Sequence, residues 1–94
     1  MLIDEIKRRN IEAMKNKDQE ARAIFSVVIT KYDNLAIELK AKNQPATDRD
    51  LISIIQKTCK ELDEEMLNWE KAGDEVKERA TLYQRRCIEE YLPI

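Results

Sequence analysis

The chain has 94 residues, the size of one compact domain, and its 17 Lys and Arg against 19 Asp and Glu give a net charge of −2. It contains one Gly and two Pro, too few for the turns of an all-β domain or for a collagenous or low-complexity chain. A hydrophobic content of 43% argues against full disorder. These counts predict a single all-α domain.

The chain contains no histidine, the commonest general base and metal ligand in proteins. Its two cysteines, Cys59 and Cys87, form no CxxC pair, so zinc binding and Cys–His nucleophilic catalysis are poorly supported. We therefore expect no enzymatic activity, no metal and no cofactor. Unpaired thiols, with no signal peptide and no apolar run long enough to cross a bilayer, favour a cytoplasmic protein without a membrane partner.

Apolar residues recur at helical spacing in four segments, which predict an array of about four helices near 2–16, 19–42, 48–72 and 75–91. Asp18 is the expected N-cap of the second helix. The first helix carries its apolar side on Leu2, Ile3, Ile6, Ala13 and Met14. The heptad-type seam of the second consists of Ala21, Phe25, Val28, Tyr32, Leu35 and Leu39, widened by Ile24, Ile29 and Ala36. A stripe of this width fits a helix with two neighbours.

Local signals mark the ends of the third and fourth helices. Thr47 can cap the third, with Asp50 in the reciprocal position of a capping box. Gly73, the single glycine, stands where a left-handed residue would end that helix, and Asp74 can cap the next. The third helix is expected to bury Leu51, Ile55, Cys59, Leu62, Met66 and Trp69, flanked by Ile52 and Ile54. The fourth is expected to bury Val76, Ala80, Tyr83, Cys87 and Tyr91, with Pro93 just past its end.

Some apolar residues admit a functional interpretation beside the structural one. Cys59 and Cys87 lie on seams and are expected as buried structural thiols rather than reactive ones. Trp69 is expected in the core, with base stacking as the alternative. Three residues fall off the main stripes and are expected either at exposed contact points or packed against a further neighbour: Val27, Ile37 and Leu82.

Basic residues concentrate near the start of the chain, where residues 1–17 carry five basic and three acidic groups, a net charge of +2. A phosphate-binding surface needs several such charges on one face, so Lys7, Arg8, Lys15 and Lys17 are the predicted nucleic-acid contacts. The interspersed acids leave a charged surface without a partner as one alternative. A protein–protein interaction module, or a homodimer formed through the seam of the second helix, is the other.

Three short motifs resemble the GatB/YqeY family. AMKNKD at 13–18 is similar to the AMKxKD opening of that family. WEKAGD at 69–74 resembles its FxKAGR-type helix junction, and EEYLP at 89–93 resembles its EYLP ending. The motifs occur in the order and spacing of the family, with the helix start at Thr47 between them.

The resemblance implies an all-helical domain similar to the tail domain of the B subunit of aspartyl/glutamyl-tRNA amidotransferase, with an accessory role in tRNA binding or translation. The carbon–nitrogen ligase activity attached to the family, with glutamine as amido donor, is expected to belong to the amidotransferase, because its kinase-like and glutaminase parts are missing here. Family members continue into a second small helical domain, so this chain is expected to match the first domain alone. Phe25 and Ser26 stand where the family carries a Leu-Arg pair, which removes one expected RNA contact.

Overall fold

A computed structural model describes residues 1–93 as four helices, α1 (Leu2–Lys15), α2 (Gln19–Ala41), α3 (Asp48–Ala72) and α4 (Glu75–Glu89), with no strand in that range. The predicted all-α fold is therefore confirmed. The first two helices end one residue earlier than predicted, and α4 ends two residues earlier. After α4 the backbone closes a tight turn before Pro93, since the amide of Leu92 donates to the carbonyl of Glu89 at 2.9 Å.

Side-chain caps fix the starts of α2 and α3, as the sequence predicts. The carboxylate of Asp18 accepts a hydrogen bond from the amide of Ala21 at 3.1 Å. Thr47 and Asp50 form both halves of a capping box, the Thr47 amide donating to the Asp50 carboxylate at 2.8 Å. These bonds satisfy amide groups that a helix start would otherwise leave unpaired.

Gly73 and Asp74 form the junction between α3 and α4. Gly73 adopts the left-handed conformation, with a φ of 72°, and its amide donates to the carbonyl of Glu70 at 3.1 Å. The Asp74 side chain then accepts from the amide of Lys77 at 3.1 Å and starts α4. A residue without a Cβ adopts this φ at little cost, which explains why the single glycine lies here.

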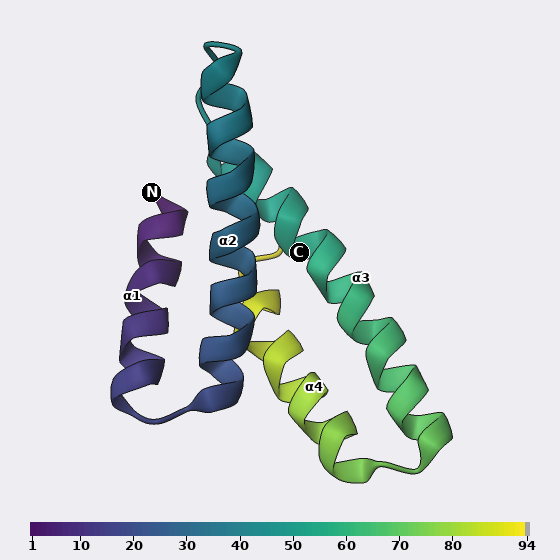
Figure 1. The fold of residues 1–94 in the computed structure, drawn as a ribbon. Helices are drawn as coiled ribbons and strands as arrows, with labels where there is room; N and C mark the ends of the chain where they lie inside the picture. Colours follow the sequence, from purple (N-terminus) through teal and green to yellow (C-terminus); the bar gives the residue numbers. More distant parts are fainter. Residues whose placement is uncertain (94) are drawn as a thin grey trace.

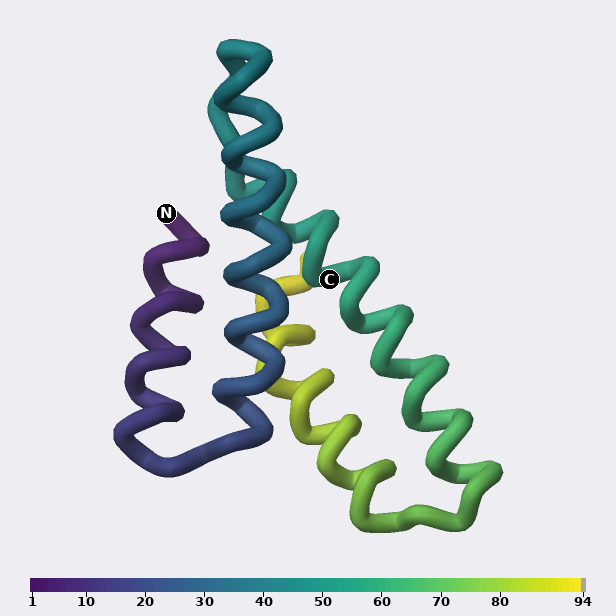
Figure 2. The backbone as a smooth tube through the Cα atoms, viewed as in Figure 1, coloured from purple at the N-terminus to yellow at the C-terminus, as the bar shows by residue number. Residues whose placement is uncertain are grey.

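The helices form two antiparallel pairs, α1 with α2 and α3 with α4 (Figure 1). The long α2 also packs against α3 and α4 and is the central helix of the array. The backbone path shows that the connection from α2 to α3 lies at one end of the molecule, while the α1–α2 and α3–α4 turns lie at the other (Figure 2). The array measures 48 × 28 × 25 Å.

The core lies around α2 and draws on all four helices. Its largest fully buried side chains are Phe25, Ile6, Leu51, Ile55, Ile88 and Val28. Each side chain of this size contributes about 1.5–3 kcal/mol when it leaves water. Cys59 and Cys87 are free thiols buried in the same cluster, as predicted.

The predicted seams of α1 and α2 are only partly correct. Met14 was expected on the buried side of α1, yet 48% of its surface is exposed. The last two members of the α2 seam, Leu35 and Leu39, are half-buried. For Leu35 and Leu39 the reason is length: the 23 residues of α2 extend about 34 Å, against about 21 Å for the 14 residues of α1. The end of α2 therefore extends beyond its neighbour.

The predicted seam of α4 needs the larger correction. Val76 is 79% exposed and Tyr83 is 44% exposed, while Ala80 is half-buried. The buried side of α4 consists instead of Thr81, Cys87 and Ile88. Thr81 is tolerated there because its hydroxyl donates to a backbone carbonyl one turn earlier, at 2.8 Å.

The far end of α3 is also less buried than its seam predicts. Met66 and Trp69 are half-buried, and the Trp69 ring is covered by the amine of Lys77, which lies 4.5 Å from its centroid. Of the three off-stripe residues, Val27 and Ile37 are exposed and Leu82 is half-buried.

Candidate nucleic-acid interface

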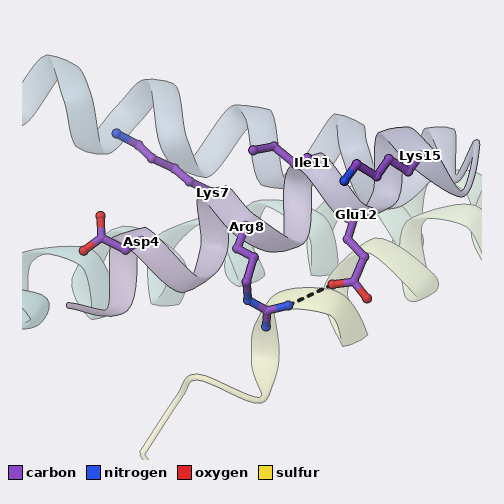
Figure 3. A pocket seen from close by; sticks show the side chains of 6 residues that line it. All are labelled: Asp4, Lys7, Arg8, Ile11, Glu12 and Lys15. Carbon is purple, nitrogen blue, oxygen red and sulfur yellow. Dashed lines mark hydrogen bonds and ion pairs between the residues drawn. The ribbon is translucent and has the colours of Figure 1, made fainter.

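Three of the four predicted phosphate contacts lie around one hollow on the outer face of α1. Lys7, Arg8 and Lys15 line a shallow hollow of about 480 Å³ together with Asp4, Ile11 and Glu12 (Figure 3). Residues three, four, seven and eight apart share one face of a helix, so the spacing itself brings these side chains together. Ile11, which is 51% exposed, forms the apolar floor between the charged side chains.

Two of these cations form exposed ion pairs. The amine of Lys7 lies 3.6 Å from the carboxylate of Asp33 on α2, and both side chains are about half exposed. Arg8 donates to the carboxylate of Glu12 at 2.9 Å, one turn along the same helix. Exposed pairs of this kind contribute about 0–1 kcal/mol, so either cation can exchange its partner for a phosphate at small cost. Lys15 forms no ion pair with any described residue.

Lys17, the fourth predicted contact, lies apart from the other three. It occupies the turn between α1 and α2 with a φ of 56°, a left-handed conformation that a lysine rarely adopts. Its side chain lines a second hollow of about 210 Å³ that also includes Met14 and Arg22. The structure thus divides the predicted patch in two, and it adds Arg22, whose place on α2 gave no sequence signal.

Arg9 belongs to the same basic cluster in the sequence but points inward. Its guanidinium donates to the Tyr91 hydroxyl at 2.7 Å and to the Glu90 carboxylate at 2.5 Å. It also lies over the ring of Phe25, 4.9 Å from the centroid. Arg9 therefore fastens the segment after α4 to the α1–α2 pair and contributes no charge to the outer face of α1.

The pKa values of both cysteines and of Tyr83 are raised, which favours their neutral forms. Burial raises the pKa of the Cys59 and Cys87 thiols, which lowers the thiolate fraction available as a nucleophile. A hydrogen bond to the Asp18 carboxylate, followed by burial, raises the pKa of Tyr83 to about 12. Within residues 1–93 no three His, Cys, Asp or Glu side chains are grouped closely enough to hold a metal ion.

The geometry of this site supports binding through charged surface side chains. The outer face of α1 presents three cations and two carboxylates around the exposed side chain of Ile11. No helix in the described part of the chain has the length and apolar character that crossing a bilayer requires.

The three motifs that resemble the GatB/YqeY family coincide with structural joints of this fold. Asp18 caps α2, Gly73 closes α3, and Tyr91 binds Arg9. Each of these residues therefore has a structural reason for its position, independent of any partner. Comparison with known proteins found no match to a protein-family model, a curated protein or a solved structure.

Proposed function

We propose that this chain is a non-catalytic helical module that binds RNA through the outer face of α1, with tRNA as the RNA class suggested by its resemblance to the GatB/YqeY family. The observation that carries the proposal is the grouping of Lys7, Arg8 and Lys15 on one exposed helix face. Residues 1–17 carry a net charge of +2, whereas the whole chain carries −2. A local basic surface on a slightly acidic protein directs RNA to one face.

The expected binding is electrostatic and of modest strength. Each phosphate neutralised by a lysine or arginine releases condensed counterions, which makes the affinity fall steeply as salt rises. Three to four contacts predict a slope of log K against log salt of about −2 to −4. Non-specific binding of this kind has dissociation constants of roughly 10⁻⁴–10⁻⁶ M at physiological salt.

The two buried cysteines support a non-catalytic role for the chain. Both thiols are buried and have raised pKa values, which is opposite to the shift of a catalytic cysteine. The exposed carboxylates of the outer face are interleaved with cations, an arrangement that suits solubility and binding. We therefore do not assign the carbon–nitrogen ligase activity of the amidotransferase to this chain.

The test compares two charge-matched triple variants in tRNA binding. The site variant is Lys7→Gln/Arg8→Gln/Lys15→Gln, and the control removes three exposed lysines elsewhere, Lys40, Lys42 and Lys57, also by change to Gln. Fluorescence anisotropy of labelled tRNA is recorded between ~50 mM and ~200 mM salt. The site variant should lose about tenfold or more in affinity and flatten the salt slope, while the control stays close to the parent chain. Equal losses in both variants, or no binding at the lowest salt, would refute the proposal.

Lys17 allows a further control that separates charge from folding. The change Lys17→Gly removes the cation and places glycine at a left-handed position, so the fold should keep its stability. If the α1–α2 turn also touches RNA, this variant binds tRNA more weakly without a change in its unfolding midpoint.

A protein–protein interaction module is the second candidate function. Exposed apolar side chains favour it, notably Ile37 on α2 and Val76 on α4. The seam of α2 proposed for a homodimer is a weaker basis, because Phe25, Val28 and Tyr32 are buried within the array. Light scattering at several protein concentrations tests self-association directly.

A further inference from the structure

An apolar stripe on α4 is covered near the C-terminal end of the helix and exposed towards its N-terminal end. Val76, Ala80, Tyr83 and Cys87 follow one another at spacings of four, three and four, which places them on one side of the helix. Their exposure changes along the stripe: Val76 is 79% exposed, Tyr83 is 44% exposed, and Cys87 is buried. The stripe therefore leaves the core towards the N-terminal end of α4.

The position of α2 explains why only part of the stripe on α4 is buried. The Tyr83 hydroxyl donates to the carboxylate of Asp18, and Gln84 donates to Glu20, so the start of α2 lies level with the middle of α4. The α3–α4 turn continues past the α1–α2 turn and diverges from it (Figure 1). Val76 thus lies on a free helix face and not in a gap of the core.

Two arginines border one side of this stripe, while the two flanking residues on the other side contact acidic side chains. In heptad terms Val76, Ala80, Tyr83 and Cys87 take the inner positions, and the flanking positions are Arg79 and Arg86 on one side and Lys77 and Gln84 on the other. Arg79 and Arg86 are exposed, and neither forms an ion pair with the described residues. Lys77 lies 3.9 Å from the Asp74 carboxylate and covers the ring of Trp69.

These flanking charges argue against a second copy of the chain as the occupant. In an antiparallel pair of α4 helices, Arg79 and Arg86 of one copy would face the same arginines of the other. In a parallel pair they would face Lys77 and Gln84. Both arrangements place like charges or neutral groups together, which opposes association.

We propose that the stripe Val76–Ala80–Tyr83 is a docking site for an amphipathic helix of another protein with acidic residues beside its apolar face. Apolar side chains of the partner would cover Val76 and Tyr83, and its carboxylates would pair with Arg79 and Arg86. This site lies on α4 and uses none of the cations of the proposed RNA surface on α1. The two proposals can therefore fail separately.

The test uses two synthetic peptides of three heptads, each with leucine at the inner positions. The flanking positions are all glutamate in one peptide and all lysine in the other, so neither peptide pairs well with itself. Binding is followed by anisotropy of the labelled peptide and by the emission of Trp69, the single tryptophan of the chain, whose ring contacts Lys77 beside the stripe. The parent chain should bind the glutamate peptide at least about tenfold more tightly than the lysine peptide at low salt.

Two variants locate the binding site. Arg79→Glu/Arg86→Glu should reverse the preference and favour the lysine peptide, while Val76→Ser should weaken binding of both peptides. Ile37→Ser is the matched control, since it removes an exposed apolar side chain on α2, and it should bind like the parent chain. Circular dichroism and the unfolding midpoint establish that each variant is folded.

Four outcomes would overturn the proposal. They are the absence of saturable binding to the glutamate peptide, equal affinity for the two peptides, an unchanged preference in Arg79→Glu/Arg86→Glu, and self-association that Val76→Ser abolishes. If Arg79→Glu/Arg86→Glu instead loses tRNA affinity and keeps its peptide preference, these two arginines bind RNA and not an acidic helix. The Lys7→Gln/Arg8→Gln/Lys15→Gln variant should bind the peptides normally, which keeps this result distinct from that of the RNA proposal.

Discussion

The guanidinium of Arg9, in the first helix, donates a hydrogen bond of 2.7 Å to the hydroxyl of Tyr91, after the last helix. The same guanidinium reaches Glu90 and the backbone carbonyl of Cys87, and it lies 4.9 Å from the centroid of the Phe25 ring. One side chain thus ties the segment that follows α4 to the opposite side of the array.

Replacing Arg9 by Lys should destabilise the fold by about 1–2 kcal/mol. A lysine keeps the charge but loses the planar group that lies over the Phe25 ring and reaches several acceptors at once. Urea denaturation gives the free energy of unfolding. Arg8→Lys is the control, because Arg8 lies on the outer face of α1, and its effect should stay within about 0.5 kcal/mol. Equal effects of the two changes would show that the Arg9 contacts are energetically unimportant.

The bond between Tyr83 and Asp18 should make stability fall at alkaline pH. The pKa of Tyr83 is about 12 in the folded chain, above its ordinary value of 10.0. Its contribution is therefore complete below pH 10.0 and is lost as the pH rises towards about 12, where the unfolded chain has already released the proton.

The change Tyr83→Phe tests this pH dependence. The variant should be less stable at neutral pH, and its stability should decline less steeply between pH 10.0 and about 12. Some decline should persist, since burial also raises the pKa values of Tyr32 and Tyr91. Denaturation curves recorded across this range provide the measurement, and parallel declines in the two proteins would contradict the assigned role.

Gly73 should resist substitution because of its backbone conformation and not for lack of space. Its φ is 72°, and a Cβ added there would have no neighbouring atom within 4 Å. Gly73→Ala should cost about 1 kcal/mol, the usual penalty of a left-handed L-residue, and the β-branched valine should cost more. Gly73→Asn should cost less, because asparagine tolerates this conformation. Thermal unfolding should show the smallest loss of stability for the asparagine variant, a larger loss for alanine and the largest for valine.

Val76 and Ile88 offer a direct test of which side of α4 faces the core. Ile88→Ala should cost about 2–5 kcal/mol, because it leaves a cavity at a fully buried position. Val76→Ala removes a mostly exposed side chain and should change stability by less than about 0.5 kcal/mol. Chemical denaturation distinguishes the two. A large loss at Val76 would mean that the apolar stripe is covered within the chain.

The accuracy of the sequence predictions depends on how local each feature is. The caps at Asp18, Thr47 and Asp74 and the left-handed Gly73 were predictable, since a helix end is completed by residues within one turn of it. The α4 seam was predicted only in part. Periodicity places Val76 and Cys87 on one side of a helix, but it does not say how far a neighbouring helix extends along that side.

The candidate binding site was also predictable from local spacing only in part. The spacing of Lys7, Arg8 and Lys15 was enough to group them on one face of α1. The same spacing carried a signal for Arg9 that the prediction left unused, because Arg9 lies three residues after Ile6 and four before Ala13, on the buried side of α1. What spacing does not give are its partners, Phe25 and Tyr91, which come from two other parts of the chain.

The sequence by itself therefore determined the fold class, the helix junctions and most of the core, because helical periodicity and capping act over a few residues. The tertiary structure decided which groups hold Arg9 and which apolar stripe lacks a neighbour. Both follow from packing between segments distant in the chain, and the second also depends on where the helices diverge.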